Sequence, residues 1–155
     1  MCLHQPNSLK GHLMLKGLDP LLSPDLLHVL AQMGHGDQIA LVDRNFPAAS
    51  TARCLVRLDG CDLSAAVRAV LSVLPLDTFV EHPIAAMDVV DRPGVVPEVQ
   101  QEVFSLARSV EDREIDIERV ERFAFYERAR QAFAVVATSE ARPYGCVILT
   151  KGVIF

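Results

Sequence analysis

Several features are scarce or absent in this chain, and each absence argues against a class of function. The four cysteines include no CxxC or CxxH spacing, which argues against a zinc site. No apolar run is long enough to span a membrane, and the first residues lack the apolar core of a secretory signal. We therefore expect a cytoplasmic protein with reduced thiols and no membrane partner.

The charge balance and the glycine pattern argue against two further classes. The net charge is −5, so no basic excess offsets the repulsion of phosphates, and we expect no nucleic-acid partner. Gly34 and Gly36 form a GxG motif, but they follow a predicted helix instead of a strand and lack the third glycine of a dinucleotide-binding loop. We expect neither a cofactor nor a metal ion.

The apolar residues, which make up half of the chain, repeat in patterns that predict helices and strands. Helical spacing predicts helices over residues 24–33, 63–74, 97–110 and 123–132. Short apolar runs predict strands over residues 38–42, 54–58, 84–90, 115–120, 133–137 and 146–151. Gly34 is expected to end the first helix as a C′ glycine, and residues 43–53 are expected to form a loop.

This alternation predicts an α/β fold in which a mostly parallel central sheet is flanked by helices. The length of 155 residues favours a single domain. Residues 1–13 show no clear period, so we expect a disordered extension ahead of a domain that covers residues 14–155. The pattern does not determine the order of the strands.

His35, which stands between two glycines, is the first candidate for chemistry. Histidine exchanges protons near neutral pH, and the flanking glycines allow close approach of a ligand. A histidine at a helix end can also simply compensate the helix dipole, so both interpretations stay open. Asp43 ends a predicted buried strand, the place where α/β sheets present ligand groups, although it also suits an ordinary turn.

Two further groups of polar residues lie near the C-terminus. Arg122 and Tyr126 are four apart on a predicted helix and share a face, whereas Phe123 and Phe125 are expected to point into the core.

The turn Tyr144-Gly145-Cys146 precedes the last predicted strand. It can present a phenol and backbone groups to a sugar, or it can be a plain turn. We interpret Cys146 as a non-nucleophile, because the sequence places neither a histidine nor a helix N-terminus beside it.

Several stretches of the sequence carry a resemblance to a known family. They are MLKG at 14–17, LLSPDLL at 21–27, MGHGD at 33–37, Asp43 with NFPA at 45–48, DG at 59–60, RFAFYERA at 122–129, and YG at 144–145 before KG at 151–152. Over residues 14–155 the chain resembles the L-fucose mutarotase / D-ribose pyranase family, and it is more similar to the fucose branch. The family usually has asparagine where this chain has Cys146, and a thiol is a weaker hydrogen-bond partner than an amide.

The resemblance implies an isomerase that interconverts the α and β anomers of L-fucose without a cofactor. It implies a homo-oligomer, commonly a ring-shaped decamer, with sites near the contacts between subunits. It also implies that His35 is the proton donor, that Tyr126 is a second proton-transfer group, and that the sugar contacts are Asp43, Arg122, Tyr144, Gly145 and Cys146. Two alternatives remain, which are a D-ribose pyranase and a non-catalytic monosaccharide-binding protein.

The spacing of His35 and Asp43 raises a geometric question. An extended segment over residues 36–43 would span roughly 25 Å, which one monosaccharide cannot bridge. Either the backbone bends sharply at Gly36, or His35 and Asp43 reach the same sugar from two different chains. We therefore expect an isolated monomer to be inactive.

Overall fold

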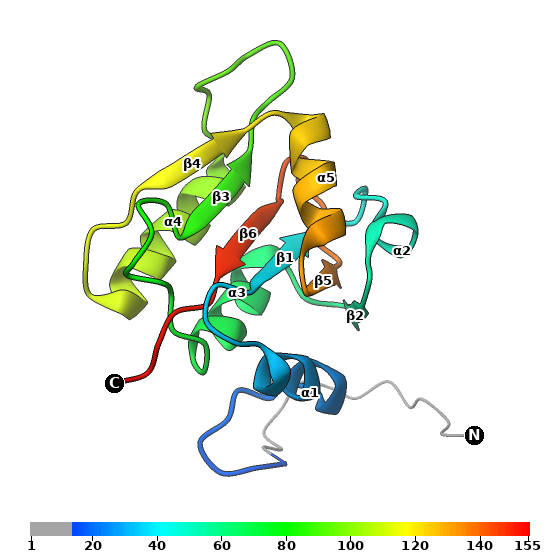
Figure 1. Cartoon of the computed structure of the whole chain (residues 1–155). Helices are drawn as coiled ribbons and strands as arrows, with labels where there is room; N and C mark the ends of the chain where they lie inside the picture. Colours follow the sequence, from blue (N-terminus) through cyan, green and yellow to red (C-terminus); the bar gives the residue numbers. More distant parts are fainter. Residues whose placement is uncertain (1–13) are drawn as a thin grey trace.

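A six-stranded sheet with the order β2-β5-β1-β6-β3-β4 forms the centre of the protein (Figure 1). The computed structural model describes residues 14–155, and the predicted extension 1–13 lies outside the described residues. The strands are β1 (Gln38–Val42), β2 (Leu55–Leu58), β3 (Ile84–Met87), β4 (Ile117–Val120), β5 (Ala134–Thr138) and β6 (Val147–Thr150). The helices are α1 (Pro24–Gln32), α2 (Ala48–Thr51), α3 (Leu63–Leu71), α4 (Glu98–Glu111) and α5 (Arg122–Gln131).

The strands are parallel except for β6. Strand β5 pairs in parallel with β1 and β2, and β3 pairs in parallel with β4. Strand β6 joins these two groups by antiparallel pairing with β1 and β3. The C-terminal ends of β1 and β3 and the start of β6 therefore meet at one edge of the sheet, which confirms the predicted mostly parallel α/β architecture.

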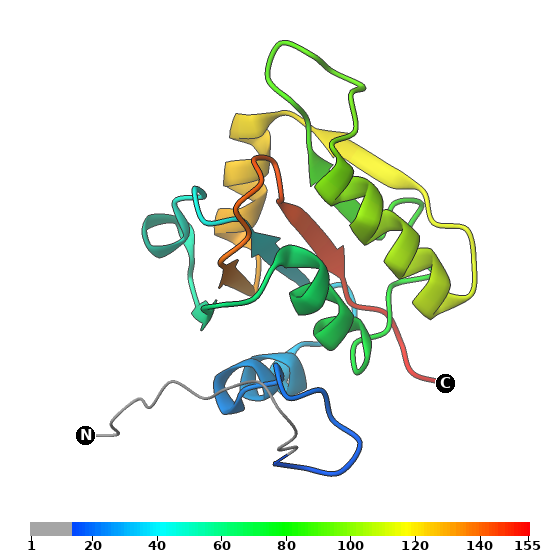
Figure 2. The same ribbon diagram turned by 180° about the vertical axis from the view of Figure 1, so that it is seen from behind.

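Helices cover both faces of the sheet because the buried strand residues alternate (Figures 1 and 2). Ile39 and Leu41 of β1 belong to the larger core, together with the apolar faces of α1, α3 and α4. Ala40 and Val42 belong to the smaller core, which includes Phe125 of α5. The helix α5 therefore lies across the sheet from α3 and α4, with its N-terminus near the edge where β1 and β3 end (Figure 1).

The predicted start of the first helix is confirmed. The Ser23 hydroxyl caps α1 by accepting a hydrogen bond from the Leu26 amide at 3.2 Å, with proline at the first helical position. The helix ends near Gly34 as expected, but the glycine with a left-handed backbone is Gly36, at a φ of 85°. Gly36 turns the chain into β1, and its amide donates to the Lys151 carbonyl at 2.9 Å.

Some local predictions were wrong. The expected loop over residues 43–53 contains the short helix α2, and the third strand ends at Met87 instead of residue 90. Phe123 is 63% exposed and does not point into the core, whereas Phe125 is fully buried as predicted. Phe123 instead lies beside Arg122, whose guanidinium carbon is 4.5 Å from the ring centroid.

Candidate active site

A pocket of about 190 Å³ opens at the edge of the sheet where β1 and β3 end and β6 begins. We call it the Asp43 pocket. It brings together five of the predicted site residues, which come from three distant parts of the sequence. Its lining residues are Asp43, Asn45, Phe46, Met87, Arg122, Tyr126, Pro143, Tyr144 and Cys146.

Asp43 is buried at the end of β1 and links two parts of the pocket wall. Its Oδ1 accepts hydrogen bonds from the amides of Asn45 at 2.9 Å and Phe46 at 3.1 Å. Its Oδ2 accepts from the Gly145 amide at 3.2 Å and lies 3.5 Å from the Cys146 Sγ. These contacts occupy both carboxylate oxygens, so Asp43 holds the turn over residues 144–146 against the end of β1.

The turn itself has an unusual backbone. Tyr144 has a φ of 62°, a left-handed conformation that costs on the order of 1 kcal/mol or more for a residue other than glycine. Its hydroxyl accepts a hydrogen bond from the Val90 amide at 3.3 Å. A Cβ atom at Gly145 would lie 2.9 Å from the Glu140 Cγ, so the turn requires glycine there.

Gln100 of α4 supports this turn, and sequence analysis missed it. Its side chain is fully buried, and its Nε2 donates to the carbonyls of Met87 at 2.7 Å and Tyr144 at 2.8 Å. Its Oε1 accepts from Arg119 at 2.6 Å. The sequence shows only a polar residue inside a predicted helix, because the bonded carbonyls lie 13 and 44 positions away.

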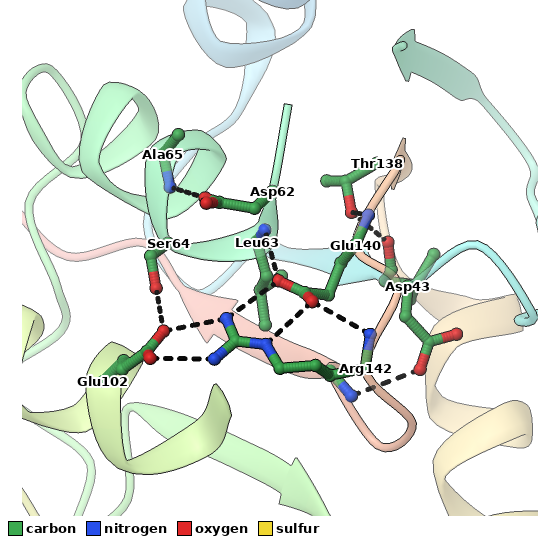
Figure 3. A network of polar contacts seen from close by, with 11 residues as sticks. Asp43, Asp62, Leu63, Ser64, Ala65, Glu102, Thr138, Glu140 and Arg142 are labelled. Carbon is green, nitrogen blue, oxygen red and sulfur yellow. Dashed lines mark hydrogen bonds and ion pairs between the residues drawn. The ribbon is translucent and has the colours of Figure 1, made fainter. Parts of the chain in front are cut away.

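A second polar network holds the segment before the turn (Figure 3). The Glu140 carboxylate accepts hydrogen bonds from the Leu63 amide at 3.1 Å and from the Arg142 Nε at 2.9 Å. Arg142 also makes two hydrogen bonds of 2.8 Å to Glu102 of α4. The hydrogen bonds from Arg142 outweigh the cost of burial and lower the pKa of Glu140 to about 2. Glu140 is therefore ionised and anchors the segment to α3 and α4.

Arg122 and Tyr126 confirm the predicted shared face of α5, because both line the Asp43 pocket. The Tyr126 ring packs edge-on against Phe46, with 5.1 Å between the ring centroids. The Arg122 Nε is buried and has no hydrogen-bond partner within residues 14–155.

Cys146 lines the pocket as a neutral thiol. Burial and the neighbouring charge of Asp43 hold the pKa of Cys146 well above its usual value. A thiolate nucleophile is therefore disfavoured at neutral pH, in agreement with the sequence interpretation. Within the described part of the chain, no three His, Cys, Asp or Glu side chains gather in a way that could hold a metal ion.

His35 does not line the Asp43 pocket. It precedes β1, whereas Asp43 follows it, so the extended strand separates the two residues. The bend at Gly36 turns His35 toward the loop after α3, where its Nε2 lies 3.1 Å from the Asp77 Oδ1 and its ring packs 5.3 Å from that of Phe79. The His35 side chain is 48% exposed. The sequence left two possibilities, which were a bend at Gly36 that brings His35 and Asp43 to one sugar within a chain, or a site shared by two chains. The structure does not show the first.

A wider hollow of about 380 Å³ lies on the other side of the loop after β1. It shares Asp43 and Phe46 with the Asp43 pocket but contains none of the other predicted sugar contacts. Arg57 and Asp59, which line it, form an exposed ion pair at 2.9 Å. Most of the predicted sugar contacts therefore lie in the smaller Asp43 pocket.

Fold and pocket together define an α/β protein with a candidate small-ligand site at the carboxyl edge of its sheet. The model of the RbsD / FucU transport protein family matches residues 16–154, and the chain belongs to this family. In residues 14–155, no helix has the length and apolar character needed to cross a bilayer.

Curated relatives cover nearly the whole chain. The fucose mutarotase of Homo sapiens is 48% identical over 146 residues, which are 90% of this chain and 94% of that protein. The L-fucose mutarotase of Actinobacillus pleuropneumoniae serotype 5b (strain L20) is 42% identical over 140 residues, which are 90% of this chain and 97% of that protein.

Solved structures share the fold. The fucose mutarotase of Streptococcus pneumoniae, solved in complex with L-fucose, superposes with a TM-score of 0.84 at 38% identity, covering 91% of this chain and all of that one. RbsD of Bacillus subtilis, solved with D-ribose, superposes with a TM-score of 0.66 at 23% identity, covering 86% of this chain and 95% of that one. At this identity the likeness shows a shared fold and nothing more.

Proposed function

We propose that this protein is an isomerase that interconverts the α and β anomers of L-fucose. The observation that carries the proposal is the Asp43 pocket, which places a guanidinium, a phenol and a strained turn around one small cavity. The relatives named above as fucose mutarotases, at 42% and 48% identity, support the choice of sugar and reaction.

The reaction needs only proton transfers. The pyranose ring opens when its ring oxygen gains a proton and the anomeric hydroxyl loses one, and it closes on the other face after rotation about the C1–C2 bond. Positioned acid and base groups typically accelerate such steps about 10²–10⁴-fold. Tyr126 lines the pocket and supplies one proton-transfer group.

The other pocket residues orient the sugar. Arg122 lines the pocket and donates to a sugar hydroxyl. The turn Tyr144-Gly145-Cys146 supplies a phenol and backbone groups. Because the Asp43 oxygens already accept from three amides and the Cys146 thiol, a sugar hydroxyl reaches Asp43 most easily by displacing the thiol, which is the weakest of these donors.

The proton donor His35 acts, in this proposal, from a second copy of the chain. It lies at the opposite end of β1 from Asp43, and the exposed ring of Phe79 packs against it. Phe79 and Val80 are exposed beside His35, and Ile154 and Phe155 are exposed after β6. Such a surface favours contact between subunits. A homo-oligomer, for which the family resemblance suggests a decamer, would join His35 of one copy to the Asp43 pocket of another. The cysteine usage favours the cytoplasm as its location.

Saturation-transfer NMR on L-fucose and D-ribose tests the proposal directly. We expect the protein to accelerate exchange between the L-fucose anomers, and His35→Ala to abolish this exchange while sugar binding persists. His28→Ala, which removes an exposed histidine from α1, is the matched control and leaves exchange unchanged. Binding of L-fucose without accelerated exchange would indicate the non-catalytic alternative, and exchange restricted to D-ribose would indicate the pyranase.

A further inference from the structure

Asp77 is a buried acid that lies outside the Asp43 pocket and contacts His35. It is 1% exposed, and its Oδ1 accepts hydrogen bonds from the Phe79 amide at 3.0 Å and from the His35 Nε2 at 3.1 Å. No motif in the sequence indicates this contact, because Asp77 follows His35 by 42 positions.

The backbone holds Asp77 rigidly in place. Its amide donates to the Thr150 carbonyl at 3.0 Å, and its carbonyl accepts from the Arg113 Nη2 at 3.2 Å. Gly152 lies so close that a Cβ there would be 2.8 Å from the Asp77 Cα. The Asp77 carboxylate is therefore a fixed acceptor, against which the half-exposed His35 ring is oriented.

The charge state of Asp77 determines which partner donates. Burial opposes its ionisation, but the hydrogen bonds from the Phe79 amide and from His35 hold the pKa of Asp77 below its usual value. An ionised carboxylate can only accept hydrogen bonds. The hydrogen in this contact must then lie on Nε2 of His35. The other ring nitrogen, Nδ1, has no hydrogen-bond partner in residues 14–155.

We propose that Asp77 is a positioning residue that fixes the hydrogen on Nε2 of His35 and leaves Nδ1 to exchange a proton with the sugar. This inference rests on the proposed role of His35 as the donor. In the forward step the imidazolium gives its Nδ1 proton to the sugar ring oxygen, the ring C1–O bond breaks, and the anomeric hydroxyl releases its proton to water. The products are the open aldehyde and neutral His35 with its hydrogen on Nε2. When the ring closes, the former ring oxygen, which is now a hydroxyl, returns its proton to Nδ1, and the new anomeric oxygen takes a proton from water. The Asp77 carboxylate accepts from Nε2 while Nδ1 exchanges its proton.

The hydrogen position can be measured independently of turnover. In protein labelled with ¹⁵N in the histidine rings, two-bond proton–nitrogen correlations distinguish the two neutral tautomers. The His35 signals are those that disappear in His35→Ala. We expect neutral His35 to carry its hydrogen on Nε2, and a predominant Nδ1–H form in the wild-type protein would overturn the inference.

Asp77→Asn tests the consequence for catalysis. An amide can rotate and donate to Nε2, which favours the wrong tautomer, so we expect kcat for anomer exchange to fall at least about tenfold with little change in KM. Asp19→Asn is the matched control, because the Asp19 Oδ1 likewise accepts the amide two positions on, at 2.9 Å from Leu21, but contacts no histidine. The control retains full exchange.

The outcomes separate this inference from the proposed function. If His35→Ala retains exchange, the assigned donor is wrong, whatever the tautomer. If His35→Ala loses exchange but Asp77→Asn keeps both kcat and the Nε2–H form, Asp77 is not the positioning residue. If Asp77→Asn fails to fold, the tautomer of wild-type His35 decides alone.

Discussion

At the scale of single residues, the pocket depends on a few buried groups with contrasting partners. Asp43 receives more donors than a solvent-exposed turn residue would, whereas the Arg122 Nε receives no acceptor within residues 14–155. Asp43 therefore shapes the pocket wall, because donors from the protein occupy both of its carboxylate oxygens.

The Cys146 thiol is the weakest polar group among the predicted sugar contacts. Replacing it tests whether this side chain contributes to sugar binding. Asparagine has nearly the same volume and adds an amide donor and acceptor beside Asp43. We expect Cys146→Asn to strengthen sugar binding by about 1 kcal/mol, or about fivefold in KM for L-fucose, with kcat unchanged. Steady-state exchange rates across a sugar concentration series measure both constants.

Cys146→Ser is the control for this substitution, because it keeps the small size and adds only a single hydroxyl. We expect it to change KM by less than Cys146→Asn. Equal KM values for the wild type and both variants would mean that the backbone of the turn, and not this side chain, contacts the sugar.

At the scale of elements, the site depends on how the segment over residues 139–146 is anchored. Glu140 and Arg142 tie this segment to the N-terminus of α3 and to α4 (Figure 3). Gln100 of α4 also holds the strained Tyr144, whose carbonyl accepts from its side chain. A helix that contributes no side chain to the pocket lining thereby determines its shape.

The anchoring by Glu140 predicts a dependence of stability on pH. The pKa of Glu140 is about 2 in the folded protein, below its ordinary value of 4.5, so its contribution is complete above pH 4.5 and is lost as the pH falls toward 2. A difference of this size corresponds to a contribution on the order of 3 kcal/mol at neutral pH. We expect Glu140→Gln to lower the free energy of unfolding at pH 7 by up to that amount and by much less at pH 2.

Urea titrations at fixed protein concentration across this pH range measure the effect. Glu114→Gln is the matched control, since its exposed carboxylate lies 3.7 Å from Arg108 and such surface pairs contribute little. An equal loss for Glu140→Gln at both pH values would show that packing, and not the charge, accounts for its contribution.

The elements also show how far the sequence alone predicts this protein. The bounds of β1 were predicted correctly, because an apolar run stands between a turn and a polar loop. The shared face of Arg122 and Tyr126 followed from helical spacing. The four-residue helix α2 is too short to show a period, and the strand order depends on pairings between distant segments. Gln100 and Asp77 were missed for the same reason, because their partners are far away in the sequence.

At the scale of the whole molecule, the candidate chemistry is divided between two ends of the sheet. The Asp43 pocket lies at the carboxyl end of β1, and the His35–Asp77 pair lies at its amino end. In the proposed homo-oligomer, a closed ring in which unlike surfaces meet would bring these two ends together at every contact. Each site would then depend on two copies, and the contact would cover apolar side chains such as Phe79, which is exposed in one chain.

Mixing two inactive variants tests this division directly. His35→Ala removes the donor and Arg122→Ala removes a sugar contact, so each homo-oligomer is expected to lose most of its exchange activity. If each site takes His35 from one copy and Arg122 from another, co-refolding equal amounts restores about one quarter of the sites, because a quarter receive both intact residues by chance. Mixing without subunit exchange restores nothing, which provides the control. We expect recovery, because the full length of β1 separates His35 from the Asp43 pocket within one chain. A co-refolded mixture that stays inactive would mean that both residues must come from the same chain, and it would contradict the two-copy site.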